Sequence, residues 1–418
     1  MKKVLIIVYY WPPSGGAGVQ RWLKFVKYLP QFGWQPTVIT TKKGDYPALD
    51  HSLEREVPQD VQVIRTKTPT FGKFFSQKGS QSTPYGSLEI NSNDSILKKL
   101  SIWIRLNLVI PDARKIWNKY ALQAAKKELG VNNYDCIVTS GPPHSTHLIG
   151  LKLKKKFKIK WIADFRDPWT KIDYLEKVKR NPITENLDRK LEDQVVQNCD
   201  LVLSINQKII SDLKVDSKSR IISNGFDPED FEDIQKKKND KFTISYFGNI
   251  TIERNPEIII EVINQIPEVA NECRIDFWGN VSKNVTEKLK DLDEHQIVIF
   301  HSYISHREVL EKMISSDLLI LVINNVPDNK GILTGKLYEY LGSGVPILGI
   351  GPVKGDAAAI LKDSKSGQMF DYNDKSGISD FIKKHFNTRS KVNRNRSKIE
   401  KYSRKEQTKL LAEILSKP

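Results

Sequence analysis

The chain has little sulfur, because its 418 residues include only three cysteines and three methionines. The cysteines, Cys136, Cys199 and Cys273, are odd in number and far apart, so their spacing matches neither a disulfide framework nor a zinc site. Long apolar runs are also missing, since no segment reaches the roughly 18 apolar residues that span a bilayer. The sequence therefore predicts a soluble protein of a reducing, intracellular compartment.

The first residues, MKKVLIIVYYWPPSGG, allow two interpretations. Two lysines before an apolar run are typical of a secretory signal. However, no cleavage site of small residues follows, and the apolar run at 4–10 ends in a Pro-Pro-Ser-Gly-Gly turn. Strand length followed by turn residues is typical of a buried strand, which is the interpretation we favour.

Acidic residues are outnumbered, with 50 Asp and Glu against 66 Lys and Arg, which gives a net charge of +16. The excess is local: residues 97–127, 151–160 and 381–418 together are net +22, and the remaining 339 residues are net −6. Charge alone would suggest a nucleic-acid-binding protein. Because the basic segments are far apart and lack a recognition helix or an aromatic stacking motif, we expect no nucleic-acid partner.

Short apolar runs alternate with amphipathic stretches along most of the chain, which is typical of parallel strands joined by crossover helices, so the fold class is α/β. A polar segment at 224–240 separates two sets of strands and indicates two doubly wound domains. We predict domains at 1–213 and 214–385, and a C-terminal helix at 386–418 that returns to the first domain. Residues 67–93 are predicted to form a long loop. The predicted strands are 4–10, 36–40, 61–65, 136–139, 161–163, 201–205, 242–247, 275–278, 297–300, 318–323 and 347–350.

The first strand leads into a glycine-rich turn, PPSGGAG at 12–18, and then into an amphipathic stretch. Glycines such as Gly15 and Gly16 at a strand-to-helix turn let backbone amides approach an anion at the positive end of the helix. The spacing is not that of the dinucleotide fingerprint, and no acidic residue ends the second strand. A phosphate site and a turn that needs glycine only for its backbone both remain open.

The second half contains two comparable segments. In YFGNITIERNPE, Gly248 follows a strand and Arg254 precedes a helix, and a cation beside a helix N-terminus adds to the attraction for a phosphate. In TGKLYEYLGSGVPIL, Thr334 precedes a helix that carries Lys336 and Glu339. These two residues are three apart and share a helix face, which is also compatible with a simple solvated ion pair.

Four motifs occur in a fixed order: YYWPPSGGAGVQR, NGFDPEDF, YFGNITIERNPE and TGKLYEYLGSGVPIL. Together they resemble the retaining glycosyltransferases of family 4, and the resemblance covers almost the whole chain. It implies the GT-B fold, in which two Rossmann-like domains face a central cleft. It also implies transfer of a sugar from a nucleotide-diphosphate sugar to an acceptor, with retention of the anomeric configuration.

The resemblance further implies where the donor binds. Asn249 stands where the family usually has arginine, so we hypothesise that Lys336 supplies the missing cation. Glu339 matches the second glutamate of the family's pair, expected at the ribose hydroxyls, whereas Gly331 stands at the position of the first. The candidate donor-binding residues are Gly15, Gly16, Gly248, Asn249, Arg254, Thr334, Lys336 and Glu339.

The candidate catalytic residues lie in WIADFRDPW, at 161–169. The family often has a histidine after this strand, and here Arg166 and Asp167 occupy that region. A carboxylate there would orient the sugar or take the acceptor proton, and an arginine would help to neutralise the leaving group. A buried Asp–Arg pair that joins two loops is the structural alternative. His144 and His147 border the same cleft in this fold and are expected to be packing or capping residues.

No Asp and His cluster suited to Mg²⁺ or Mn²⁺ is evident, so neither a metal nor another cofactor is expected. Residues 96–108, ILKKLSIWIRLNL, place apolar side chains on one side and basic ones elsewhere, as an interfacial helix does. Anionic lipid would attract such a segment by about 1 kcal/mol per basic residue. The six lysines of 151–160 are either part of the same surface or simply a solvated helix end.

We therefore expect a cytoplasmic enzyme, peripheral at the inner face of the membrane. Its expected reaction is the transfer of a sugar from a nucleotide-diphosphate sugar to a glycan or lipid-linked acceptor in cell-surface polysaccharide synthesis. A nucleotide-sugar 2-epimerase of the same fold is the enzymatic alternative.

Overall fold

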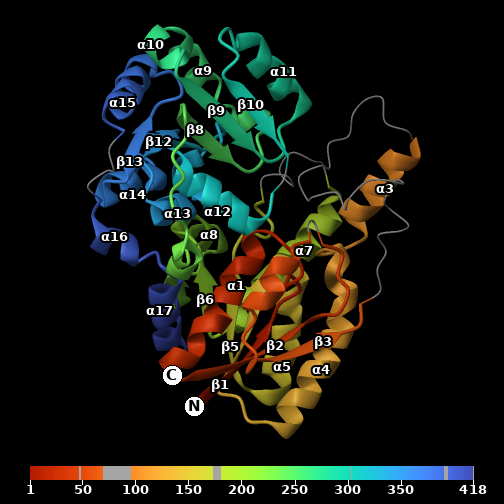
Figure 1. Cartoon of the computed structure of the whole chain (residues 1–418). Coiled ribbons are helices and arrows are strands. Elements are labelled where there is room, and N and C mark those ends of the chain that lie inside the picture. The colour runs from red at the N-terminus through yellow and green to blue at the C-terminus, as the bar shows by residue number, and fades with distance from the viewer. Residues whose placement is uncertain (47–48, 69–95, 173–179, 303, 390–393, 418) are drawn as a thin grey trace. The chain divides into compact units, whose positions relative to one another are not determined.

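The computed structural model describes residues 1–46, 49–68, 96–172, 180–302, 304–389 and 394–417 (Figure 1). The chain divides into two compact units. The first unit contains Met1–Ser223 and Gln407–Pro418, and the second contains Asn224–Glu406. Each unit is built on one parallel sheet covered by helices.

The first unit has a seven-stranded sheet in the order β3-β2-β1-β4-β5-β6-β7, in which every pair of neighbours is parallel. Its strands are β1 (Lys2–Ile7), β2 (Trp34–Thr41), β3 (Gln62–Thr66), β4 (Cys136–Gly141), β5 (Lys160–Phe165), β6 (Leu201–Ser204) and β7 (Ser219–Ile221). Its helices are α1 (Ala17–Tyr28), α3 (Ile96–Asn107), α4 (Asn118–Val131), α5 (His147–Phe157), α7 (Pro182–Asn198) and α8 (Gln207–Leu213), together with most of α17 (Arg404–Ser416).

Strand β1 is apolar on both faces because helices cover both sides of the sheet. Val4 and Ile6 pack in a cluster with α1 and α17, whereas Leu5 and Ile7 pack in a second cluster with α4, α5 and α7. All four side chains are fully buried. Successive side chains of a strand point to opposite faces, so a strand buried on both faces has a continuous rather than an alternating apolar sequence.

A buried ion pair lies at the centre of this unit. The carboxylate of Asp164, on β5, accepts hydrogen bonds from Arg21 Nη2 at 2.9 Å, from Trp22 Nε1 at 2.8 Å and from Ser140 Oγ at 2.7 Å. Arg21 also donates to the carbonyl of Ile222 at 2.8 Å. Arg21 and Asp164 are both 0% exposed. The pair therefore ties α1 to β5 and to the last residues of the unit, and each charge depends on the other.

We expect Asp164→Asn to destabilise the first unit by about 3–5 kcal/mol, because it leaves the guanidinium of Arg21 buried without its counter-charge. Seven of the eight tryptophans lie in this unit, so tryptophan fluorescence during urea unfolding reports mainly on it. The matched control is Glu54→Gln, which breaks an exposed contact with His51 in the same unit and should change stability by less than about 0.5 kcal/mol. Equal shifts of the urea midpoint in the two variants would contradict the central role of the buried pair.

The second unit has a six-stranded parallel sheet in the order β10-β9-β8-β11-β12-β13. Its strands are β8 (Phe242–Phe247), β9 (Cys273–Trp278), β10 (Val298–His301), β11 (Leu318–Val322), β12 (Ile347–Ile350) and β13 (Gly367–Phe370). Its helices are α9 (Glu257–Asn264), α10 (Pro267–Ala270), α11 (Lys283–Leu292), α12 (His306–Ser315), α13 (Gly335–Ser343), α14 (Asp356–Ser364), α15 (Lys375–Thr388) and α16 (Arg396–Glu400).

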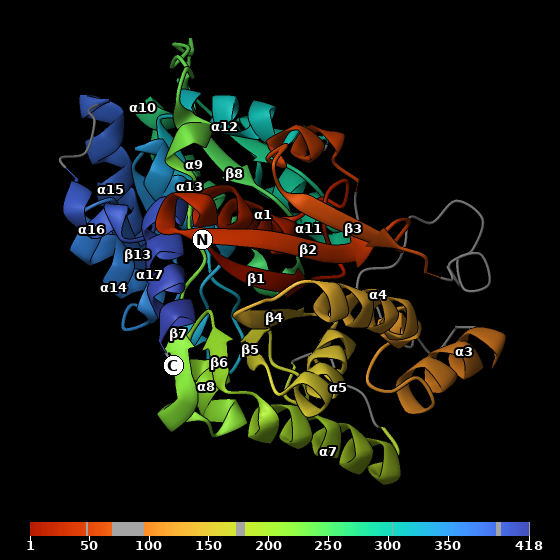
Figure 2. The ribbon, with the colours of Figure 1, turned by 90° about the horizontal axis from the view of Figure 1, so that it is seen from below.

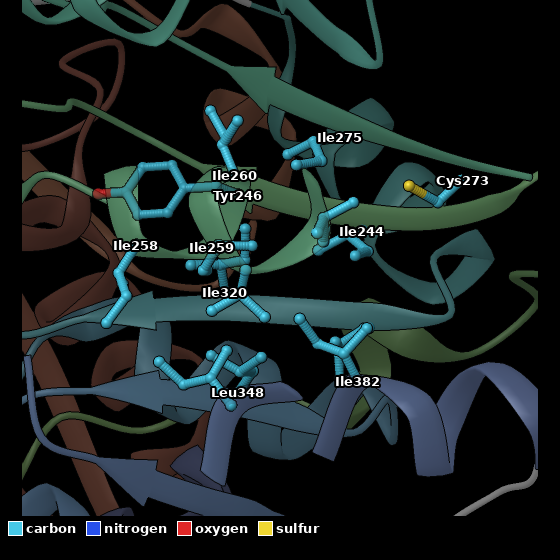
Figure 3. Packing of buried hydrophobic residues seen from close by; sticks show 14 of the residues in the cluster. Ile244, Tyr246, Ile258, Ile259, Ile260, Cys273, Ile275, Ile320, Leu348 and Ile382 are labelled. Carbon is cyan, nitrogen blue, oxygen red and sulfur yellow. The ribbon is translucent and has the colours of Figure 1, made fainter. Parts of the chain in front are cut away.

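The core of this unit also has two layers. On one face, β8 contributes Ile244 and Tyr246 to a cluster with Ile259 of α9 and Ile382 of α15 (Figure 3). On the other face, Phe247 packs with α12, α13 and α14. Figure 3 shows the ring of Tyr246 at the margin of its cluster, with the hydroxyl group directed away from the aliphatic side chains. This strand therefore places an aromatic hydroxyl at the border of the core.

The predicted α/β class and the two doubly wound sheets are confirmed, and all eleven predicted strands overlap observed ones. Two strands were not predicted, β7 and β13. The sequence prediction divides the chain at 213/214 and 385/386, whereas the structure divides it at 223/224 and 406/407. The first division lies later because β7 extends the first sheet, and the second lies later because Ile399 of α16 is packed in the second unit.

The loop predicted at 67–93 lies outside the described residues except for 67–68. None of the helices in the described part of the chain is long and apolar enough to cross a membrane.

Candidate active site

The strand orders predict where ligands bind. In a doubly wound sheet, the crevice for a ligand lies beyond the carboxyl ends of the strands, where the chain order reverses direction. This point lies between β1 and β4 in the first unit and between β8 and β11 in the second. The candidate residues of the sequence follow β1 and β5 in the first unit, and β8 and β11 in the second.

In the second unit, the loop after β8 lies against the end of β9 and the side chain of Lys336. Gly248 has a φ of 108°, a conformation that favours glycine, and its amide donates to the carbonyl of Trp278 at 2.7 Å. A Cβ atom at Gly248 would lie 2.6 Å from Cε and 3.1 Å from Nζ of Lys336. The positive φ therefore favours glycine here, and the missing side chain leaves room for the end of Lys336 beside the backbone.

Lys336 is the centre of a small polar cluster. Its Nζ donates to the hydroxyl of Tyr246 at 2.6 Å and lies 4.1 Å from the centre of the tyrosine ring. The hydroxyl of Tyr246 donates in turn to the carbonyl of Asn249 at 2.9 Å. The tyrosine thus fixes the ammonium group against the glycine loop, and Asn249 takes part through its backbone.

Arg254 is the second cation of this cluster. It ends a short 3₁₀ helix (Ile252–Arg254) directly before α9. Its Nε donates to Oδ1 of Asn324 at 2.8 Å, and the carbonyl of Asn324 accepts from Tyr372 at 3.1 Å and from Asn329 at 2.9 Å. Asn324, just after the end of β11, therefore holds the guanidinium of Arg254 in place.

The two cations influence each other. Burial, followed by the charge of Arg254, lowers the pKa of Lys336 well below its ordinary value, and the carboxylate of Glu339 partly offsets this. Burial raises the pKa of Tyr246 to about 12, against the lowering effect of Arg254. Neither cation forms an ion pair with a carboxylate of the described part of the chain. Two such cations held close together at the end of a sheet are suited to bind an anion.

The start of α13 lies beside these cations. Thr334 is its N-cap residue, but the buried Oγ1 of Thr334 has no hydrogen-bond partner among the described residues. The first amides of a helix have no acceptor within the helix, and they favour an anion. Glu339, one turn further on, makes no hydrogen bond or ion pair with any residue in the described ranges. Its carboxylate is therefore available to a ligand.

In the first unit, Gly16 is the N-cap residue of α1, with a φ of 100° and open space around its Cα, and Gly15 precedes it. Two buried polar atoms at this turn, Nε1 of Trp11 and Oγ of Ser14, have no partner in the described part of the chain. Buried polar atoms usually have partners, so a turn with these two atoms and a helix N-terminus is compatible with a polar or anionic ligand.

Arg166 is held by the main chain. Its Nε donates to the carbonyl of Gly141 at 3.1 Å, its Nη1 to that of Gly18 at 2.5 Å and its Nη2 to that of Pro142 at 2.7 Å. The guanidinium thus joins the start of α1 to the end of β4. The predicted alternative, a buried pair of Arg166 with Asp167, does not form: the buried pair of this segment is Asp164 with Arg21.

Asp167 remains available at the same edge. It is partly buried and accepts no hydrogen bond from a residue in the described ranges. Burial raises its pKa above the ordinary value, against the lowering effect of Arg166. A carboxylate beyond the end of a strand, with a raised pKa and no hydrogen-bond donor among the described residues, has the properties of a proton acceptor or of a group that binds polar ligands.

Gly18 is a residue of this site that the sequence did not single out. A Cβ atom at this position would lie 2.4 Å from Nη1 of Arg166. We expect Gly18→Ala to displace the guanidinium and to lower glycosyl transfer at least 10-fold, with a loss of stability of about 1–3 kcal/mol. The control is Gly130→Ala, where a Cβ meets no atom within 4 Å. Full activity of Gly18→Ala would show that the position of Arg166 does not matter for transfer.

The two histidines of this edge are packed, as expected. The ring of His144 stacks on Trp169 with centroids 5.2 Å apart, and that of His147 stacks on Phe165 at 4.4 Å. Burial lowers the pKa of His144 to about 3 and that of His147 well below its ordinary value. Both rings are therefore neutral at physiological pH.

No cluster of His, Cys, Asp and Glu that could hold a metal ion occurs within the described ranges. An Asp-x-Asp tripeptide is present at 291–293, and its second carboxylate accepts from the amides of Ile297 and Val298 at 2.9 Å. Asp293 is thus a turn-forming residue that precedes β10.

Tyr246 and Asn324 are the other residues that the sequence did not single out. Both follow from the strand order, because each lies at the carboxyl end of a strand beside the switch point of the second sheet. The signal in the sequence was weak, since a tyrosine inside a buried strand is usually a core residue.

Comparison with solved structures shows the same architecture in other proteins. HepE from Anabaena, in complex with UDP and glucose, matches with a TM-score of 0.62 over 100% of both chains at 14% identity. A glycosyltransferase from Rickettsia africae matches with a TM-score of 0.62 over 99% of this chain and 98% of the other, also at 14% identity. The lipopolysaccharide outer core galactosyltransferase WaaB, in its apo form, matches with a TM-score of 0.57 over 100% of both chains at 11% identity.

The fold is therefore GT-B, an α/β architecture of two Rossmann-like units. Residues 227–406, nearly all of the second unit, match the family model of glycosyl transferases group 1. The family match thus lies within the second unit, and the chain as a whole shares the fold of these solved structures. No curated protein is significantly similar to it in sequence.

Proposed function

We propose that the protein is a retaining glycosyltransferase of family 4 that uses a nucleotide-diphosphate sugar. Its acceptor would be a glycan, in lipid-linked form, during cell-surface polysaccharide synthesis. It would act in the cytoplasm, as a peripheral protein at the inner face of the membrane. The UDP bound by HepE makes a UDP-sugar the first donor to test.

The observation that carries the proposal is the pair of cations in the second unit. Lys336 is fixed against Gly248 by Tyr246, and Arg254 is fixed by Asn324. The start of α13 adds helix amides and the unpartnered hydroxyl of Thr334. A diphosphate satisfies all of these groups at once, because it offers several strong acceptor oxygens and two negative charges.

The chemistry follows from charge. When the bond between the anomeric carbon and the diphosphate oxygen breaks, negative charge accumulates on the departing nucleotide. Lys336 and Arg254 stabilise this charge, and both are already held in place, so little reorganisation is needed. The missing arginine at Asn249 is thereby compensated by a lysine that approaches the loop from α13.

In the first unit, Asp167 is proposed as the carboxylate that orients the sugar or takes the proton of the acceptor hydroxyl. Its raised pKa favours proton uptake at the end of the reaction. Arg166 is proposed to act on Asp167 and on the turn at Gly15 and Gly16, since three of its donors are used by main-chain carbonyls.

Nucleotide binding is tested first by thermal shift of the full chain with UDP, GDP, ADP and their sugar derivatives. A ligand that binds only the folded protein raises the midpoint in proportion to ln(1 + [L]/Kd). The preferred donor is then incubated with and without a lipid-linked glycan. Acceptor-dependent release of the nucleotide supports the proposal, and conversion of the donor without acceptor would instead indicate a 2-epimerase.

A further inference from the structure

The outer helices of the first unit form a groove that the reaction above does not use. It has a volume of about 670 Å³ and lies between α4, α5 and α7. Figure 2 shows these three helices, with α3, along one side of the unit. The floor of the groove is aliphatic, with Leu122, Leu148, Ile149, Leu151 and Leu191, and the rim carries Lys115, Lys119, Lys126 and Lys152. Volumes of this size are typical of small-molecule sites.

The lysines of the rim are uncompensated. None of the four makes an ion pair or hydrogen bond with a residue in the described ranges, and the described residues that line the groove include no Asp or Glu. By contrast, two other lysines of the 151–160 run are already bound. Lys154 pairs with Asp200 at 2.7 Å, and Lys160 donates to the carbonyl of Leu415 at 3.2 Å. Of that basic run, Lys152 is the residue that joins the groove.

Helix α7 has an apolar face beside the groove. On α7, Ile183, Leu187 and Leu191 recur every four residues and lie on one helix face, together with Lys190. Ile183 is 77% exposed and Leu187 is 47% exposed. The acidic residues Glu185 and Glu192 lie on the opposite side of the helix at 100° per residue. The apolar face of α7 thus continues out of the groove onto the surface.

Helix α3 extends this apolar face. The amide of Asn181, before α7, donates to Oδ1 of Asn107 at 2.6 Å, and Thr184 donates to the Asn107 carbonyl at 3.0 Å. These bonds place the end of α3 beside the start of α7. Trp103 on α3 is 48% exposed, and Leu108, directly after the helix, is 66% exposed. A tryptophan among exposed aliphatic and basic residues is typical of a surface that lies in the lipid headgroup region.

We propose that this groove binds an anionic phospholipid and docks the first unit on the membrane. The lysines of the rim would hold the headgroup phosphate, and the aliphatic floor would cover the start of an acyl chain. Helix α3 and the exposed face of α7 would lie in the headgroup layer beside it. This inference deepens the proposed membrane association and assigns it to residues outside the nucleotide site.

The test is cosedimentation of the full chain with vesicles of phosphatidylcholine containing 30% phosphatidylglycerol, at about 100 mM salt. Each basic residue near an anionic surface contributes about fivefold to affinity. We expect the variant K115Q/K119Q/K126Q/K152Q to bind at least 50-fold more weakly than wild type. The control variant K290Q/K362Q/K383Q/K384Q, with four exposed lysines of the second unit, removes the same charge and should bind like wild type.

The apolar floor is tested separately with Leu187→Glu, an exposed position where folding is not at risk. This variant should also lose vesicle binding, whereas 10 mM inorganic phosphate should not displace the wild-type protein. Equal binding of the groove and control variants would overturn the proposal, as would displacement by phosphate. A groove variant that instead loses binding to a random RNA, with vesicle binding unchanged, would assign the groove to nucleic acid.

Nucleotide binding distinguishes this proposal from the enzymatic one. The groove variants should keep the thermal shift with UDP, because none of the substituted residues belongs to the donor site. Loss of vesicle binding with an unchanged UDP response supports the groove alone. Vesicle binding without any nucleotide response would leave the groove intact and reject the proposed donor.

Discussion

Glu339→Gln is expected to lower kcat/KM for the nucleotide sugar by about 100- to 1,000-fold. The carboxylate lies on α13 near the cation cluster and has no hydrogen-bond or ion-pair partner in the described part of the chain. If it binds the two ribose hydroxyls, the substitution weakens two charge-assisted hydrogen bonds, each worth about 1.5–3 kcal/mol. Steady-state kinetics with the donor identified by thermal shift provide the measurement.

The control for this variant is Glu294→Gln, an exposed substitution outside the site. It should leave kcat/KM and the thermal midpoint unchanged. Binding of uridine provides a second readout, because uridine contains the ribose but no phosphate. Glu339→Gln should weaken uridine and UDP by similar factors. A fall in the thermal midpoint of Glu339→Gln without ligand would instead mean that Glu339 is a structural residue.

The fold was predictable because its strands are apolar on both faces. A buried parallel strand such as residues 318–322, LLILV, has no polar alternation, and its neighbour β12, with the sequence ILGI, also lacks polar side chains. The two strands that were not predicted are short and lie at sheet edges. β7 has three residues, and β13, with the sequence GQMF, includes one exposed residue and a glycine. Edge strands bury less surface, so their apolar pattern is weak.

Part of the site followed from local sequence alone. The glycine turns after β1 and β8 were evident from Gly16 and Gly248, and the structure gives both a positive φ. Lys336 was proposed as a replacement cation. Its side chain lies against Gly248, although the two residues are 88 positions apart in the chain. Lys336 lies beside this loop because a helix N-terminus after β11 is close to the loop after β8 when these strands are neighbours, and its role as the replacement cation stays a prediction.

The remaining contacts depend on long-range packing that a single sequence does not contain. Nothing in WIADFRDPW distinguishes Asp164 as the partner of Arg21 from Asp167 as the free carboxylate. Asp164 lies inside β5, where its side chain points to the face that carries Arg21. Asp167 lies beyond the end of the strand and is therefore not part of that pair. Likewise, Tyr246 was not distinguishable from a core tyrosine without its hydroxyl partners Lys336 and Asn249.

Lys336→Met is expected to weaken UDP binding by about 10- to 100-fold and to leave uridine binding unchanged, whereas Glu339→Gln should weaken the binding of both ligands. The substitution removes the ammonium donor but keeps an unbranched side chain that passes Gly248. A charge-assisted hydrogen bond to a phosphate contributes about 1.5–3 kcal/mol. Isothermal titration with the two ligands measures both effects. The control is Lys330→Met, which changes an exposed lysine before α13.

Lys336 should also make nucleotide binding dependent on pH. In the free protein, burial and Arg254 lower the pKa of Lys336 well below its ordinary value, so its ammonium group loses the proton at a lower pH than that of an exposed lysine. A bound diphosphate favours the ammonium form and raises this pKa again. UDP binding therefore takes up a proton, and between the two pKa values its affinity falls by up to about tenfold for each unit of increasing pH.

Titrations in buffers of different ionisation enthalpy count the proton directly. They are best done above about pH 7.5, where the terminal phosphate of UDP has already lost its proton. Wild type should take up a fraction of one proton, and Lys336→Met none. Arg254→Gln should also reduce the uptake, since loss of the neighbouring charge raises the pKa of Lys336 in the free protein and leaves it charged before UDP arrives. Proton uptake that persists in Lys336→Met would assign the titration to another group and would remove the buried lysine from the diphosphate site.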